Sequence, residues 1–192
     1  MSAAVLPLYE RPSILRHQVG HMNKFGRAPS ARPVTHLDNV PVDDLVTKYG
    51  SPLFVFSQKT LVQRYRELHQ AFARRYPRVR IAWSYKTNYL EAICRVFHRE
   101  GAWAEVVSPF EFDKAVDSGM SPDRIHWNGP FKPDDAIEKA LRGQAMIHID
   151  NLDELVRIER MAERLNLRPK VAVRINVAVE GLPAWSRFGL NL

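Results

Sequence analysis

A lysine stands at the end of an apolar stretch, where its amine could attack a carbonyl group. Lys86 closes the segment 80–86, which is predicted to be a strand and runs into Thr87 and Asn88. A lysine amine attacks carbonyls only when it is neutral, and burial or a nearby cation lowers its pKa toward that state. Alone, such a residue is more typical of a surface lysine whose stem lies along apolar neighbours. Its surroundings must therefore decide between the two interpretations.

Polar residues that could serve chemistry follow the other predicted strands as well. In a (β/α)8 barrel the carboxyl ends of the strands carry the active site, and an open doubly wound sheet follows a similar rule. The pattern predicts one shared site without choosing between these folds. The residues are Ser84, Lys86 and Asn88; Glu105 and Ser108; Asn128 and Gly129; Asp150 and Asn151; and Arg174 and Asn176.

Three polar residues near this predicted site also have a structural interpretation. Arg174 is a cation on a predicted strand, where an unpaired charge is costly. It either serves the site or pairs with an acid such as Glu105 or Asp150. Asn128 either contacts a ligand or satisfies a turn, and the turn is slightly favoured. Glu111 is expected to open a helix as an N-terminal acid rather than to touch a ligand.

The histidines and the cysteine near the strands are interpreted as structural. His126 and His148 lie near strand ends but lack carboxylate or cysteine partners at metal-binding spacing. We expect them to line the core or a barrel, and we predict no metal site. Cys94 falls on an apolar helix face and is interpreted as a buried thiol, not a nucleophile. As the only cysteine it forms no intrachain disulfide, which fits a reducing compartment.

The elements that must position these residues alternate along the chain. Leu61, Tyr65, Leu68 and Phe72 share one helical face, and similar apolar spacing recurs after each later strand. This alternation with short connections predicts βαβ units and a parallel sheet. No Gly-x-Gly-x-x-Gly motif or phosphate loop occurs. Strands are predicted at 53–56, 80–86, 103–107, 124–127, 146–149 and 171–176, and helices at 41–46, 61–72, 90–97, 110–117, 133–141 and 152–165.

The charge of the chain is concentrated near its N-terminus. The net charge is +7, yet residues 38–192 carry only +3 of it, because residues 11–37 hold five bases and no acid, and Glu10 offsets one of those bases. Such an arm could touch nucleic acid, but a solvated tail is favoured and we expect no nucleic-acid partner. No apolar run reaches the length of a membrane span, and no signal peptide is recognised. A cytoplasmic location is expected.

The chain resembles the diaminopimelate, ornithine and arginine decarboxylases, enzymes that depend on pyridoxal 5'-phosphate (PLP). The lysine segment around Lys86 is similar to that family's cofactor-binding lysine motif, and six further segments match in order. Each match is weak alone, whereas seven in collinear order from about residue 45 onward are specific. The further segments are Tyr49 to Val55, Trp103 to Glu111, Arg124 to Lys132, His148 to Leu155, Val173 to Asn176 and Ser186 to Leu190.

This resemblance implies a cofactor, a reaction class and a set of site residues. Lys86 would form the internal aldimine with PLP, and Glu105, Arg174 and Asn128 would line the cofactor pocket. An amino acid would be the small-molecule substrate, and complete members of the family form homodimers with shared active sites. Two departures separate this chain from the usual pattern: Glu105 stands where the family usually has aspartate, and Arg187 where it usually has lysine.

The resemblance also implies a fold and a division of the chain. The expected fold is α/β, an incomplete (β/α)8 TIM barrel with about five of eight strands and an irregular basic N-terminal extension. Residues 1–40 would be a flexible extension, 41–57 a lead-in helix and strand, and 58–192 a partial PLP-binding barrel without the C-terminal strands and β domain.

A complete barrel takes about 250 residues, so we expect this chain to be truncated and weakly active or inactive alone. Two alternatives to a decarboxylase remain open at this point. One is a non-catalytic PLP-binding protein, and the other is an interaction protein or remnant that uses its basic N-terminal arm. Turnover of an amino acid by the purified chain, lost on Lys86→Ala, would refute the expectation of inactivity.

Overall fold

A computed structural model describes residues 34–177, 180 and 187–191. The chain forms two compact units, Met1–Phe54 and Val55–Leu192. The predicted basic extension over residues 1–40 lies outside the described residues except for residues 34–40. The predicted divisions at residues 40 and 57 stay predictions. Among the described residues, no helix is long and apolar enough to cross a bilayer.

The first unit contains a small hairpin and the predicted short helix. Strands β1 (His36–Leu37) and β2 (Val40–Pro41) pair antiparallel. The turn between them holds Asp38 and Asn39 at positive φ, as two-residue hairpin turns require. Helix α1 (Val42–Tyr49) follows, with two acidic residues in its first turn and Gly50 at its end. The helix predicted from residue 41 is therefore confirmed.

The strand predicted over residues 53–56 is wrong. This segment forms no strand, and the side chains from Leu53 to Phe56 are all exposed. Its apolar composition suggested a strand, but a strand also needs a neighbour to bond its backbone groups. No described segment pairs with these residues.

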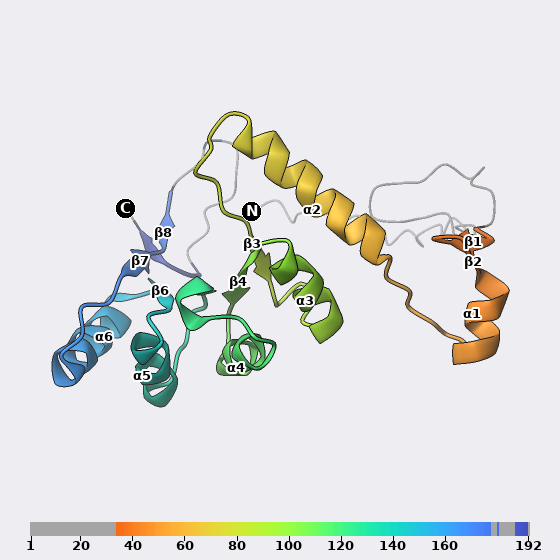
Figure 1. The fold of residues 1–192 in the computed structure, drawn as a ribbon. Coiled ribbons are helices and arrows are strands. Elements are labelled where there is room, and N and C mark those ends of the chain that lie inside the picture. The colour runs from red at the N-terminus through yellow and green to blue at the C-terminus, as the bar shows by residue number, and fades with distance from the viewer. Residues whose placement is uncertain (1–33, 178–179, 181–186, 192) are drawn as a thin grey trace, which may run out of the picture. The chain divides into compact units, whose positions relative to one another are not determined.

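The second unit is built on a five-stranded parallel sheet whose strand order, β3-β4-β5-β6-β7, follows the chain order (Figure 1). A doubly wound sheet reverses its order at a switch point, whereas a barrel does not. The uniform order therefore confirms the predicted α/β fold with a partial TIM barrel. The strands are Ala82–Ser84, Trp103–Val106, Ile125–Trp127, Met146–Ile149 and Val171–Val173.

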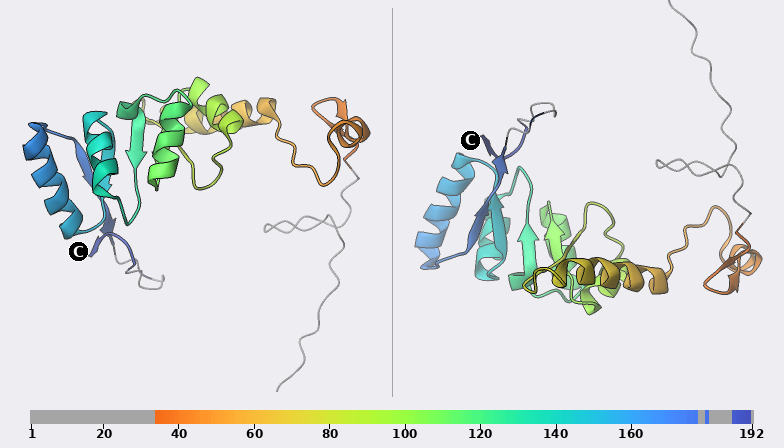
Figure 2. Two further views of the ribbon diagram at one scale, coloured as in Figure 1. Left: turned by 90° about the horizontal axis from the view of Figure 1, so that it is seen from below. Right: turned by 90° about the horizontal axis from the view of Figure 1, so that it is seen from above.

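A helix precedes the sheet and another follows each of its first four strands. Figure 1 shows α3, α4, α5 and α6 side by side along one side of the strands, and Figure 2 shows this layering from two further directions. The predicted helices are all present, and a short 3-10 turn, η1 (Pro122–Arg124), precedes β5. The helices are α2 (Gln58–Ala73), α3 (Glu91–Arg99), α4 (Pro109–Asp117), α5 (Asp134–Arg142) and α6 (Leu152–Leu165).

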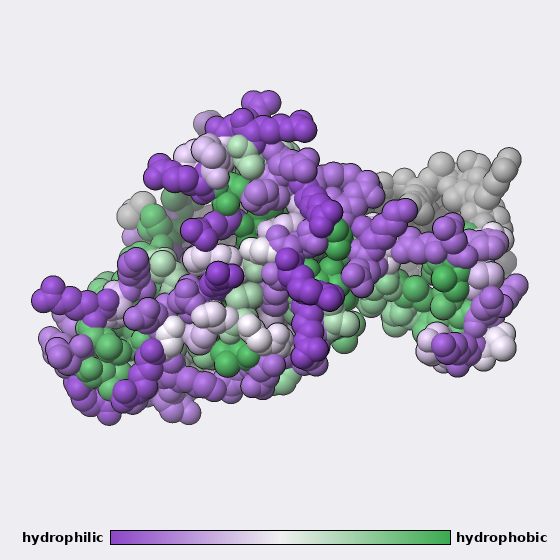
Figure 3. All heavy atoms as spheres, in the orientation of Figure 1, coloured by the Kyte–Doolittle hydropathy of each residue, from purple (hydrophilic) through white to green (hydrophobic). Residues whose placement is uncertain are grey.

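The core lies between the sheet and these helices. Side chains alternate between the two faces of a strand, and the helix-facing positions Val106, Ile125, Trp127 and Ile147 are fully buried. A second cluster forms where Tyr65 of α2 packs against α3. Apolar side chains also reach the surface on α6, and Figure 3 shows green spheres among purple ones where Figure 1 places this helix.

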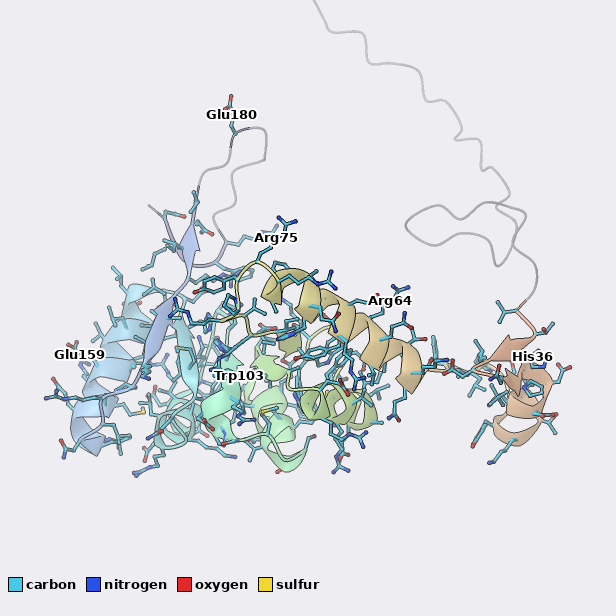
Figure 4. All side chains as sticks on the ribbon, turned by 45° about the horizontal axis from the view of Figure 1, so that its top comes forward. His36, Arg64, Arg75, Trp103, Glu159 and Glu180 are labelled. Carbon is cyan, nitrogen blue, oxygen red and sulfur yellow. The ribbon has the colours of Figure 1, made fainter. Side chains whose placement is uncertain are left out.

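The opposite face of the sheet is polar and half-buried. Ser84, Glu105 and His126 are register partners across three strands on this face. Trp103, labelled in Figure 4, and His148 lie on the same face by the alternation of their strands. In a barrel this face is the interior, so the two faces differ as the predicted fold requires.

The last predicted strand, 171–176, is interrupted. β7 ends at Val173, and β8 (Ile175–Asn176) pairs parallel with β9 (Leu190–Asn191) outside the main sheet. Between them Arg174 donates its backbone N–H to Ile149 O at 2.9 Å and accepts from Leu190 N at 2.8 Å. One residue thus joins the end of the sheet to the short β8–β9 pair.

Truncating a helix-facing core residue should cost far more stability than truncating an exposed strand residue. Ile147→Ala removes a side chain with 0% exposure in β6, and we expect a loss of about 2–5 kcal/mol in the free energy of unfolding. The matched control Ile175→Ala alters a side chain that is 50% exposed, with an expected loss of about 0.5 to 1 kcal/mol. Urea unfolding measures both values. Equal losses would contradict the assigned position of the core.

Candidate functional site

Lys86 lies in the turn that directly follows β3. The turn is closed by the Thr87 N–H, which donates to Ser84 O at 3.1 Å, and the Lys86 side chain is exposed. Tyr85, just before it, is fully buried and donates its N–H to Glu105 O at 2.9 Å. The lysine is therefore carried by a fixed backbone while its amine stays accessible at the carboxyl end of the sheet.

Glu105 lies on β4, beside β3 and on the polar face of the sheet. The Ser84 hydroxyl donates to its Oε2. Its Oε1 is buried and has no hydrogen-bond partner among the described residues. A buried carboxylate oxygen without a partner is unfavourable, so this atom is available to a donor or a cation that a ligand would bring.

Glu111 confirms its predicted role at the start of a helix and also shapes the site. Ser108 caps α4 by accepting from the Glu111 N–H at 3.2 Å, while Glu111 Oε2 accepts from Val107 N at 2.8 Å. Burial raises the pKa of the Glu111 carboxyl, the Val107 N–H opposes this, Glu105 adds to it, and the Lys86 cation also opposes it.

Asn128 follows β5 and satisfies its own turn. Its side-chain oxygen accepts from the Gly129 N–H at 3.0 Å, and its backbone N–H donates to Val106 O at 2.8 Å. Gly129 adopts φ +135°, and an added Cβ would lie 2.6 Å from Val107 O. The turn interpretation of Asn128 thus has its hydrogen bond, and Gly129 packs this loop against the one that follows β4.

Arg174 forms the ion pair that the sequence left open. Its guanidinium lies 3.1 Å from Asp150 Oδ1, and the Phe188 ring is 4.9 Å away. The Arg174 side chain is 31% exposed, whereas Asp150 is buried. Asp150 is therefore the partner among the two acids proposed, and the Arg174 side chain is only partly buried.

Lys132 and Glu154 were not singled out from the sequence, yet they form the most buried ion pair among the described residues. Lys132 Nζ lies 2.9 Å from Glu154 Oε1, and the two side chains are 0% and 2% exposed. The amine also donates to Gly129 O and His148 O, and Glu154 Oε2 accepts from Asp150 N. Burial lowers the pKa of the Lys132 amine, and the Glu154 carboxylate opposes this shift.

His126 and His148 line the polar face of the sheet, as predicted. His126 Nδ1 and His148 Nε2 are 2.9 Å apart and share a hydrogen bond. Burial lowers the pKa of both imidazoles, and the nearby Glu105 opposes this. Among the described residues no group of three or more histidine, cysteine or acidic residues could hold a metal ion. Cys94 is buried in α3, and burial raises the pKa of its thiol.

The structure brings all four predicted site residues to one edge of the sheet. Lys86, Glu105, Asn128 and Arg174 lie on or directly after β3, β4, β5 and β7, and these strands are parallel. The carboxyl ends of parallel strands are where (β/α) folds bind their ligands.

Comparison with known proteins assigns this arrangement to a family. The family profile described as "Pyridoxal-dependent decarboxylase, pyridoxal binding domain" matches residues 60–190. This chain belongs to that family. The diaminopimelate decarboxylase of Methanothermobacter thermautotrophicus is 32% identical over 136 residues, which is 71% of this chain and 31% of that protein. The one from Zymomonas mobilis is 30% identical over 75% of this chain and 35% of its own length.

Solved structures show the same likeness within the family. Diaminopimelate decarboxylase from M. jannaschii, in complex with L-lysine, superposes with a TM-score of 0.71 and 28% identity. The match covers 82% of this chain and 39% of that one. The chain thus spans about a third of the length of the curated decarboxylases it matches, and it contains the part that the family profile describes as the pyridoxal-binding domain.

The raised pKa of Glu111 predicts a definite pH dependence. The folded state binds this proton more tightly than the unfolded chain does. The stability that the bound proton adds is therefore fully present below pH 4.5, the ordinary pKa of a glutamate carboxyl, and it is lost as the pH rises through the higher pKa of the folded state. Glu111→Gln keeps an oxygen acceptor for the Val107 N–H and removes the titration. The unfolding free energy of the wild type should therefore fall relative to that of Glu111→Gln as the pH rises above 4.5.

Urea unfolding at a series of pH values measures this difference. The control is Glu159→Gln on the exposed side of α6, whose side chain points away from the sheet in Figure 4. A wild-type stability that rises relative to Glu111→Gln over the same range would show that Lys86 and the Val107 N–H outweigh the burial of this carboxyl.

Proposed function

We propose that this chain provides the cofactor-holding part of a PLP-dependent amino-acid decarboxylase, with Lys86 as the lysine that bonds to the cofactor. The observation that carries the proposal is the position of Lys86. It stands at the carboxyl end of the first sheet strand, beside Glu105, in a domain of the pyridoxal-dependent decarboxylase family.

The chemistry of the described residues suits this cofactor. PLP carries an aldehyde that bonds to a primary amine, and Lys86 presents an exposed amine on a fixed turn. The cofactor also carries a ring nitrogen and an anionic phosphate. Glu105 Oε1 is buried without a hydrogen-bond partner among the described residues, and the Arg174 guanidinium is partly open to an anionic group. An amine, an acceptor and a cation thus lie at one edge of the sheet.

The residues of this chain have separate tasks in the proposed reaction. When bound, PLP supplies the electron sink that accepts the pair left behind as carbon dioxide departs. Lys86 would hold the cofactor through its amine. Glu105 and Arg174 line the pocket with opposite charges, and Asn128 shapes the turn beside them. The buried apolar face of the sheet keeps these groups on a rigid support.

An amino acid is the proposed class of substrate. Several matching proteins are named diaminopimelate decarboxylases, and the M. jannaschii structure contains L-lysine. One relative, from Niallia circulans, is named for decarboxylation of a glutamyl group on an acyl-carrier protein and is 29% identical over 142 residues. The proposal is therefore made for the α-amino-acid class rather than for one member of it.

The proposal predicts a selective adduct on Lys86. The purified 192-residue chain is mixed with PLP, its visible absorbance is recorded, and it is reduced with borohydride and mapped by mass spectrometry. We expect a visible band and a reduced adduct mainly on Lys86, because its amine is exposed at the same end of the sheet as Glu105 and Arg174. Lys86→Ala should abolish both the band and the selective adduct.

A lysine at the other end of the sheet provides the matched control. Lys170 is exposed and directly precedes β7, so Lys170→Ala should leave the Lys86 adduct unchanged. Adducts spread evenly over surface lysines, or a band that survives Lys86→Ala, would contradict the proposal. Because the chain alone is expected to be weakly active or inactive, the adduct on Lys86, and not the release of carbon dioxide, decides this test.

A further inference from the structure

The carboxyl ends of β5, β6 and β7 are joined by one chain of buried contacts. Lys132 Nζ donates to Gly129 O at 2.8 Å in the loop after β5 and to His148 O at 2.9 Å on β6. Its partner Glu154 begins α6 and accepts the Asp150 N–H at 2.9 Å. Asp150 in turn pairs with Arg174, which follows β7.

The same chain of contacts reaches the loop that follows β4. Gly129 packs against Val107 O closely enough to leave no room for a Cβ. The Val107 N–H donates to the carboxylate of Glu111 at the start of α4. A second tie comes from α6, where Arg157 donates to Lys132 O at 2.7 Å. The buried pair thus stands in the middle of the groups at the end of the sheet.

Stability alone gives a poor reason for such a pair. Removing two charges from water is costly, and well-packed apolar residues in the place of a buried ion pair are often as stable or more so. Here the amine bonds to acceptors on two successive strand ends, and the carboxylate bonds to both the amine and the next loop. These directional contacts set the relative position of the loops, which apolar packing does not do.

We propose that Lys132 and Glu154 are positioning residues of the site. Their buried pair fixes the loops after β5 and β6, and through Asp150 it sets the position of the Arg174 guanidinium. The inference rests on the proposed function only in taking this edge of the sheet as the cofactor face. Neither residue needs to touch the cofactor or the substrate. Their effect is exerted through the backbone of Gly129 and Asp150.

The test compares two double variants of the full chain. Lys132→Met with Glu154→Gln removes both buried charges and keeps an oxygen acceptor for the Asp150 N–H. The control, Lys139→Met with Asp113→Asn, makes the same kind of change in an exposed pair with 55% and 52% exposure. Amide hydrogen exchange is measured by NMR without cofactor, residue by residue, in the wild type and in both variants.

The informative amides are those of Asn128 and Arg174, since neither bonds to a substituted side chain; they donate to Val106 O and Ile149 O. Tyr85 and Trp103 are the reference amides, bonded to Glu105 O and Ile81 O. We expect exchange at Asn128 and Arg174 to quicken at least about tenfold relative to the references in the first variant only. A uniform change at all four amides, or no change, would overturn the proposal.

Two additions keep the test decisive. If the double variant does not fold, Glu154→Asp is used instead, because it keeps both charges but shortens the side chain that carries the carboxylate. The same selective increase in exchange at Asn128 and Arg174 is then expected, and its absence would contradict the proposal. The second addition is the PLP adduct, whose selectivity for Lys86 should fall in the Lys132→Met, Glu154→Gln variant. Hydrogen exchange is measured without cofactor. If the wild-type chain forms no Lys86 adduct, the proposed function is overturned, and the exchange rates still decide whether Lys132 and Glu154 position the loops.

Discussion

A charge that is buried away from water must find all of its partners inside the protein, and Lys132 meets this requirement in a way that organises the end of the sheet. Its amine has three donors, and its acceptors are two backbone carbonyls and the Glu154 carboxylate. Because an unsatisfied group here is expensive, the two loops that supply the carbonyls have little freedom to move apart. The geometry of the predicted site therefore depends on a pair that lies beneath it and is hidden from solvent.

Two helix starts in this unit share one arrangement, which explains how strand ends become fixed points. Ser108 caps α4 and Asn151 caps α6, and in each case the acid three residues later bonds back to the N–H that precedes the cap. This is a variation on the capping box, in which a cap and a third-position acid satisfy backbone donors reciprocally. At α4 the acid is Glu111, and at α6 it is Glu154, which takes on the Lys132 amine as well. The Glu154 carboxylate thus both satisfies a backbone donor at the start of its own helix and pairs with Lys132, which is distant in the chain.

The sequence allowed the alternation of strands and helices to be predicted, because apolar periodicity is a local property that survives folding. The helix over 152–165 and the strand over 146–149 were predicted to the residue. What failed depended on neighbours distant in the chain. Residues 53–56 have the composition of a strand but no partner, and 171–176 breaks at Arg174, whose backbone bonds to two different segments. Lys132 and Glu154 are 22 residues apart, and nothing in their local sequence reveals that they meet. Lys86 could be predicted as a site residue because its motif is local, and Asp150 was one of two acids considered for Arg174.

The polar face of the sheet connects the carboxyl end of the strands, where the predicted site residues lie, to the rest of the fold. One face is sealed by helices, whereas the other carries Ser84, Glu105, His126 and His148 in a half-buried row. Groups in such a row interact more strongly as water is removed, since their electrostatic interactions grow as the local dielectric falls. Burial lowers the pKa of both imidazoles, whereas the nearby Glu105 raises it. Within the described sheet β3 and β7 are the outer strands, and each has one neighbour. Any strand that pairs with β3 or β7 therefore also changes how far water reaches these polar side chains. The surroundings of Glu105 are therefore shaped by the interior face of the sheet as well as by the loops at the strand ends.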